Sequence, residues 1–165
     1  MKRTIVLMFF SMSMVAFANA QNLDKLVKAF QGNAKAEHHT ITKEMMGMMA
    51  AQADSSSQKK VPGFIQRIEK MDVFTLEDYQ GKDAGGIIKE MEGYKDGNGF
   101  ETLISVNNDK DHVRIVAHKE GNAVSEVAII VRDEKDVVLV RFVGNLNMDD
   151  LQSIVNEQKG KFQKQ

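Results

Sequence analysis

The residues best suited to chemistry lie close together, in a segment rich in histidine and methionine. Two histidines, His38 and His39, precede four methionines, Met45, Met46, Met48 and Met49. Imidazole nitrogens and thioether sulfurs are ligands that Cu(I) accepts. A copper site needs three or four donors at one point, whereas a helix here would spread its methionines over more than one face. The sequence therefore keeps copper binding as an alternative, and favours methionines that fill a core or line a groove.

The remaining candidates for catalysis do not form a recognisable motif. A Ser–His–Asp site needs a serine on a sharp turn, but the GxSxG pattern is absent and the serines fall in a polar run, Ser55–Ser57, or within predicted strands. His112 and His118 share one predicted strand and stand roughly 20 Å apart, too far to hold one metal. Helix capping accounts for the acidic pair Asp149-Asp150. We therefore expect no catalytic residue, no metal and no cofactor.

Composition excludes further classes of chemistry and partner. The chain has no cysteine, which excludes disulfides, thiol catalysis, cysteine-ligated zinc and a lipid anchor on cysteine. Its formal net charge is −1, so no basic field that attracts nucleic acid is expected.

Residues 1–20 have the organisation of a secretory signal peptide. Lys2 and Arg3 form the basic end, and Thr4–Phe17 forms the apolar centre. An uncleaved membrane anchor is the alternative, but the apolar run is short for a span of about 20 residues. No later segment is long and apolar enough to cross a membrane.

The predicted cleavage site follows directly. Ala18 and Ala20 satisfy the small-residue rule, and cleavage would leave Gln21 as the first residue. We expect the remainder, residues 21–165, to be a single exported domain, periplasmic in a bacterium with two membranes.

Apolar spacing and capping residues predict four helices. They cover Gln21–Gln31, Lys43–Ala53, Ala84–Tyr94 and the residues after Asn147. Thr42, Asp83 and Asn147 are suitable N-caps for the last three, and Gly160 is the expected stop of the last helix. The polar stretch Asp54–Gly63 is expected to be a surface loop.

Strand-forming residues flank the second predicted helix and then dominate the second half of the chain. His39–Thr42 and Ile68–Thr75 would give a β–α–β unit, right-handed if the two strands are parallel. Four later segments with short polar connections predict an antiparallel meander: Glu101–Val106, His112–His118, Val124–Val131 and Val137–Val143. Gly144 is expected to end the last strand.

The last two strands are apolar on both sides, so we expect both sides to be covered by helices or by a partner. We assign one side to Val127, Ile129, Val131, Val137, Leu139 and Val143, and the other to Ala128, Ile130, Val138, Val140 and Phe142. The predicted fold is α+β, with a mostly antiparallel sheet of about five to six strands, a C-terminal four-strand meander and helices mainly on one face.

Three features together resemble a known family. They are the Thr40-Ile41-Thr42 strand leading into the methionine-rich helix, the strand start Phe100-Glu101-Thr102-Leu103, and the ending VVLVRFVGNLNMDDL over residues 137–151. The combination resembles the exported proteins and lipoproteins of Bacteroidota described as "domain of unknown function 4252", over most of residues 22–158. The resemblance implies no catalytic residues. It favours an envelope-regulatory or sensing role, because members are often encoded beside extracytoplasmic sigma factors.

The sequence therefore favours an exported, non-catalytic interaction or ligand-binding module of the bacterial envelope, whose partner is an envelope protein or a second copy. Its contact surface is expected near the methionine helix or on the second face of the last two strands. The alternatives are copper binding and an enzyme of an unrecognised type, which would need a pocket joining His38 or His39 to distant carboxylates.

Overall fold

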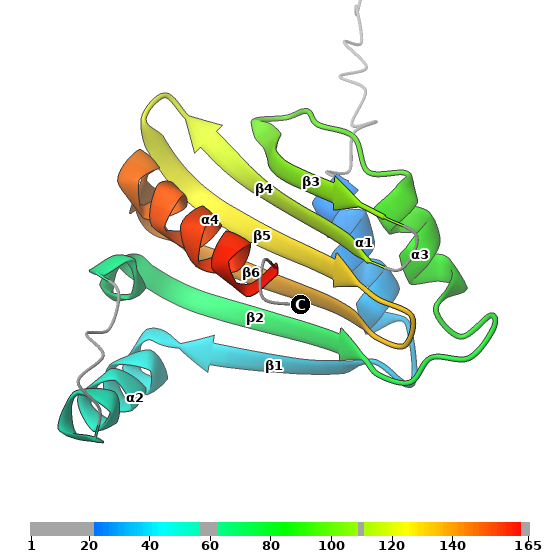
Figure 1. Cartoon of the computed structure of the whole chain (residues 1–165), viewed down its shortest axis with the longest axis horizontal. Coiled ribbons are helices and arrows are strands. Elements are labelled where there is room, and N and C mark those ends of the chain that lie inside the picture. The colour runs from blue at the N-terminus through cyan, green and yellow to red at the C-terminus, as the bar shows by residue number, and fades with distance from the viewer. Residues whose placement is uncertain (1–21, 57–62, 109–110, 163–165) are drawn as a thin grey trace, which may run out of the picture.

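Six strands form one antiparallel sheet in the order β1-β2-β6-β5-β4-β3, flanked by helices (Figure 1). The computed structural model describes residues 22–56, 63–108 and 111–162. The strands are β1 (Glu37–Thr42), β2 (Ile68–Leu76), β3 (Phe100–Asn107), β4 (His112–Glu120), β5 (Ala123–Arg132) and β6 (Val137–Asn147). The helices are α1 (Asn22–Gln31), α2 (Lys43–Ser56), the 3-10 helix η1 (Gly63–Arg67), α3 (Gly85–Glu92) and α4 (Met148–Phe162).

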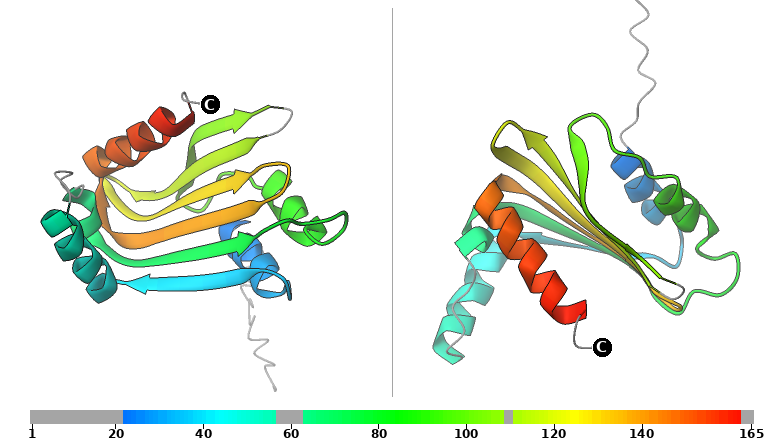
Figure 2. Two further views of the ribbon diagram at one scale, coloured as in Figure 1. Left: turned by 60° about the horizontal axis from the view of Figure 1, so that its bottom comes forward. Right: turned by 45° about the horizontal axis from the view of Figure 1, so that its top comes forward.

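The α+β class and the antiparallel meander are confirmed, but the helices are divided between the two faces of the sheet. Figure 2 shows α1 and α3 on one face and α4 on the other. Each face has its own buried cluster, so the sheet is the middle of three layers. Because both faces are covered, the central strands β5 and β6 are apolar on both sides.

The core beneath α1 and α3 explains the spacing of α1. Leu23, Leu26 and Phe30 are fully buried, and the Phe30 ring lies 5.7 Å from the ring of Phe74 on β2, between centroids. The predicted first helix is therefore confirmed, with its start at Asn22.

The start of α4 is fixed by a reciprocal cap. The Asp150 amide donates to Oδ1 of Asn147, and the Asn147 amide donates to Oδ2 of Asp150, each at 2.9 Å. Arg67 of η1 pairs with the same Asp150 carboxylate. Asn147 therefore caps α4, as the sequence predicted. Gly160 does not end the helix, which continues to Phe162, since one glycine costs a helix only about 1 kcal/mol.

The division of β5 and β6 side chains between faces differs from the sequence assignment. Arg132 pairs with Val137 across the turn, so from Arg132 back to Glu126 the odd-numbered residues of β5 oppose even-numbered residues of β6. Ile130 therefore lies opposite Leu139, and both belong to the core under α1 and α3. Ile129 belongs to the cluster under α4. Counting each strand separately could not set this register, because the hairpin turn decides it.

The region between β1 and β2 also differs from expectation. The two strands are antiparallel, with Glu37 opposite Thr75, so no β–α–β unit forms. α2 and η1 lie at one end of the sheet and return the chain beside β1 in the opposite direction (Figure 1). α2 extends to Ser56 and takes in the start of the predicted loop Asp54–Gly63. The rest of that loop, up to residue 62, lies outside the described residues.

Two predicted boundary residues have other roles. Asp83 does not cap α3, whose N-cap is Ala84 without a side-chain bond. The Asp83 carboxylate instead lies 2.6 Å from Nζ of Lys35. Gly144 does not end β6. It lies inside the strand. Glycine is needed at this position because a Cβ would overlap the Arg67 carbonyl oxygen.

The predicted signal peptide, with its cleavage residues Ala18, Ala20 and Gln21, lies outside the described residues. Within residues 22–56, 63–108 and 111–162, none of the helices has both the length and the apolar character that a membrane span requires.

Candidate functional site

A single buried methionine attaches α2 to the rest of the protein. Burial is described for α2 residues 43–52, and in that range only Met46 is buried, at 7% exposed. Met46 belongs to the cluster under α4, together with Phe64 and Ile68. α2 projects from the end of the sheet (Figure 1), so most of its surface has no covering layer.

The other three methionines of α2 are exposed. Met45 is 43%, Met48 62% and Met49 58% exposed. Their spacing of i, i+3 and i+4 puts them on one side of the helix. We call these three residues the α2 methionine face. Only two other large apolar side chains are exposed in the described parts of the chain, Val106 and Met148, so this face is the main concentration of exposed apolar surface.

Local interactions hold α2 in place weakly. The Met45 amide donates to Oγ1 of Thr42 at 3.4 Å, which confirms the predicted cap with a long bond. A hydrogen bond with Thr42 lowers the pKa of the Glu44 carboxyl in the first turn. Gly47 in the middle costs about 1 kcal/mol. Because a helix of this length is marginal in water on its own, α2 needs tertiary contacts such as those of the buried Met46.

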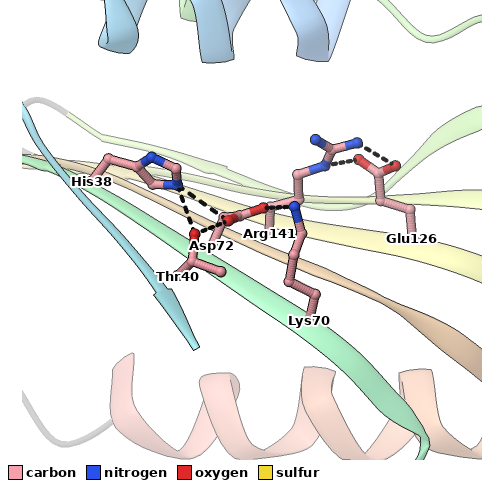
Figure 3. A network of polar contacts seen from close by, with 6 residues as sticks. All are labelled: His38, Thr40, Lys70, Asp72, Glu126 and Arg141. Atoms are coloured by element: carbon pink, nitrogen blue, oxygen red, sulfur yellow. Dashed lines mark hydrogen bonds and ion pairs between the residues drawn. The ribbon is translucent and has the colours of Figure 1, made fainter. Parts of the chain in front are cut away.

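The polar residues on the face of the sheet that α1 covers form a self-sufficient network (Figure 3). Asp72 on β2 is 3% exposed. Its carboxylate accepts from Oγ1 of Thr40 at 2.7 Å, pairs with Nζ of Lys70 at 2.8 Å and lies 3.1 Å from Nε2 of His38. Burial alone would raise the pKa of Asp72, but these bonds outweigh burial and the pKa is lowered.

The same network continues to β5 and β6. Arg141 donates to both carboxylate oxygens of Glu126, at 2.6 and 3.0 Å, in the paired geometry that suits a guanidinium. The bond with Glu126 raises the pKa of Arg141, against the effect of burial. In the described residues, no buried side-chain nitrogen or oxygen lacks a hydrogen-bond partner. These bonds join β1 to β2 through Asp72 and β5 to β6 through Glu126.

The four histidines have separate partners in the structure. His38 stacks on Phe74 with 4.1 Å between ring centroids, on the face opposite the cluster that contains Met46. His39 contacts Glu37 at the surface. His38 and His39 alternate along β1 and so point to opposite faces of the sheet, and copper binding by this segment stays an untested prediction. The described residues also contain no group of three or more His, Asp or Glu that could hold a metal.

The two distant histidines are occupied by neighbours. Nδ1 of His118 lies 2.8 Å from the Ser125 hydroxyl, and Nε2 of His112 lies 2.8 Å from a guanidinium nitrogen of Arg132. Of the two histidines named for an enzyme pocket, His38 meets a carboxylate from a distant segment, Asp72, at 3.1 Å, and His39 meets Glu37 two residues away.

The second contact surface suggested by the sequence is split by the register of β6. Ala128 and Ile130 are buried beneath α1 and α3. Val140 and Phe142 are half-buried on the α4 side. The five residues assigned to that surface therefore do not form one patch, and α2 is left as the main exposed apolar element.

Sequence reasoning missed one pocket, between α3 and strands β3 to β5. Arg114 and Arg132 are among its lining residues. Its residues come from four separate elements, so no local sequence pattern could have revealed it.

A comparison with protein families decides where the chain belongs. The family model described as Domain of unknown function (DUF4252) matches residues 30–154. The chain belongs to this family. The match contains α2, all six strands and the start of α4, so the elements described above are those of a DUF4252 domain. No curated protein and no solved structure matches the chain. The DUF4252 description names no activity, and the function must be argued from the surface itself.

Proposed function

We propose that this DUF4252 protein is an exported, non-catalytic interaction module of the bacterial envelope, and that the α2 methionine face binds an apolar segment of a partner protein. One observation carries the proposal. Three methionines, Met45, Met48 and Met49, are exposed together on a helix in which Met46 is the only buried residue of the range 43–52 whose burial is described. Grouped exposed apolar side chains are typical of interaction sites, and methionine adapts to partners of different shape.

An energy estimate sets the size of the contact. Burying a whole methionine contributes roughly 1.5–3 kcal/mol, so covering three half-exposed ones contributes about 3 kcal/mol. A micromolar complex needs about 8 kcal/mol. The methionine face can therefore be the centre of the interface but not all of it. The half-buried Ile41 and Ile65, which pack at the edge of the same cluster as Met46, are the nearest apolar extension.

The titratable groups support a non-catalytic role. Asp72, Glu126 and Arg141 are occupied by partners within the sheet (Figure 3), whereas catalytic groups need a free lone pair or proton in a cleft. The export part of the proposal is supported by the signal-peptide features of residues 1–20. The family resemblance, in turn, supports an envelope-regulatory or sensing role.

The proposal can be tested by capture and then by measured affinity. We would express the full 165-residue reading frame with a C-terminal tag, purify it from envelope extracts and identify bound proteins by mass spectrometry. The expected result is one reproducible partner. The purified partner should bind the wild-type protein at least about tenfold more tightly than it binds a Met48→Ser, Met49→Ser double variant.

Val106→Ser is the matched control, because Val106 is also exposed, at 44%, but lies on β3, the opposite edge strand. It should bind like wild type. Equal losses in both variants, or no loss in either, would contradict the assignment of the α2 methionine face. A dimer that dissociates in the methionine variant would replace the partner protein with a second copy of the chain.

A further inference from the structure

A pocket of about 300 Å³ lies between α3 and the strands β3, β4 and β5. This volume is at the lower end of the range for small-molecule sites. The apolar side chains of its lining on the α3 side are Met91 and Ile130. Val106 and Val113 form a cross-strand pair on the face of Val131, in the cluster under α4. Two arginines, Arg114 and Arg132, form the charged part. The pocket therefore offers an apolar wall and a cationic end in one small space.

The positive charge of the pocket is only partly balanced. Its lining contains Arg114, Arg132 and one carboxylate, Glu92. Arginine has no acceptor, so the Arg132 nitrogen that lies 2.8 Å from His112 donates to Nε2. His112 is then neutral in this arrangement, and the lining carries one net positive charge.

Two neighbours of Arg114, Tyr94 and Asp96, lie outside the lining of the pocket, and Asp96 keeps its own negative charge near Arg114. Asp96 accepts from the hydroxyl and amide of Thr102, at 2.6 and 2.9 Å. Burial, with a smaller effect of Asp96, raises the pKa of Tyr94 to about 12, so its phenol stays neutral. Arg114 lies over that ring and donates to the Tyr94 carbonyl at 3.1 Å.

Glu92 shows which kind of group the pocket accepts. Its carboxylate lies 3.2 Å from Arg132, but its side chain is 66% exposed, whereas the Arg132 side chain is 20% exposed. Such a pair is weak because water competes for the carboxylate. A carboxylate entering from the pocket can take the place of Glu92, which then turns into solvent.

We propose that this pocket binds a small monocarboxylate with an apolar body, its carboxylate on Arg132 and its body against Met91 and Ile130. One net positive charge suits a monoanion, and a guanidinium suits the two oxygens of a carboxylate. A phosphate would leave the apolar wall unused. The inference is independent of the α2 methionine face, which lies on a different element.

The test is a titration of the isotope-labelled protein, expressed from the full reading frame, followed by NMR. The probes are hexanoate, the neutral hexanamide of the same length, and inorganic phosphate. We expect hexanoate to shift the amides of Met91, His112 and Arg132 in a saturable way, and hexanamide to bind at least about tenfold more weakly. Phosphate that binds as tightly as hexanoate, or no saturable shift with hexanoate, would overturn the proposal.

Variants separate the ligand site from general stability. Glu92→Gln should tighten hexanoate binding about threefold to tenfold, because it removes the competing carboxylate. Arg132→Gln should weaken binding on the order of tenfold, and Arg132→Lys less than that. Lys35→Gln is the control, since Lys35 belongs to another exposed pair, and it should change nothing. Weaker binding in Glu92→Gln would contradict the exchange of Glu92 for the ligand.

Discussion

The helices α1 and α2 stand on either side of β1 in sequence and use their apolar residues in opposite ways. α1 buries Leu23, Leu26, Val27 and Phe30 against the sheet. In the range 43–52, where its burial is described, α2 buries Met46 alone and exposes three methionines. Both sequences contain enough apolar residues for a core-facing helix. The difference is that α1 lies over the sheet, whereas α2 lies beyond its end.

The contrast separates a structural role from a binding role. α1 covers a sheet face on which the apolar core meets the closed polar network of Asp72 and Arg141 (Figure 3). Its removal would expose that whole layer. α2 covers little of the sheet and keeps its own apolar side chains in water, a cost that a bound partner would remove. We therefore expect changes in α1 to act on stability and changes in α2 to act on binding.

The largest effect should come from the core of α1. Leu26 is fully buried, so Leu26→Ala leaves a cavity where the leucine side chain was. We expect a loss of about 3 kcal/mol in the free energy of unfolding. Urea denaturation followed by circular dichroism measures it. A loss below about 1 kcal/mol would show that α1 is not part of the cooperative core.

A smaller, pH-dependent effect should come from Asp72. This residue of β2 joins β1 to the sheet through Thr40 and His38. Hydrogen bonds to a charged group contribute about 1.5–3 kcal/mol, so Asp72→Asn should cost about 2 kcal/mol at pH 7. The folded-state pKa of Asp72 is lowered. Its contribution is therefore complete above the unfolded value of about 3.9 and is lost as pH falls through the lower folded value.

Denaturation of wild type and Asp72→Asn at several pH values tests this sign. The difference between the two proteins should stay constant from pH 7 to about pH 5 and shrink below about pH 4. A difference that grows on acidification would mean that the network favours the protonated carboxyl.

The smallest effect on stability should come from the α2 methionine face. Met48→Ser changes a side chain that is mostly in water, so the free energy of unfolding should change by less than about 0.5 kcal/mol. The same urea measurement applies. A loss near that of Leu26→Ala would break the contrast, because it would place Met48 in the core.

The elements that sequence could predict are those with a strong local signal. The spacing of Leu23, Leu26 and Phe30 defined α1, and Asn147 marked the start of α4. Pairing was harder, because a turn of four residues sets whether Ile129 or Ile130 faces Leu139. The α+β class and the antiparallel meander needed no such detail.

The candidate site was only half predictable. The sequence singled out the methionine segment, but the exposure of Met48 depends on where α2 lies relative to the end of the sheet, which no local pattern records. The pairing of Asp72 with Thr40 and the meeting of Arg114 with Arg132 in one pocket depend on strand order. Both therefore appeared only with the fold.

The most direct test of the binding role is site-specific photocrosslinking in the cell that makes the protein. A photoreactive amino acid would replace Met48 in one variant and Lys82, which is exposed in the loop before α3, in the other. The account predicts one dominant crosslinked protein from position 48 and none from position 82. Identical crosslink patterns from both positions, or no crosslink from position 48, would contradict it.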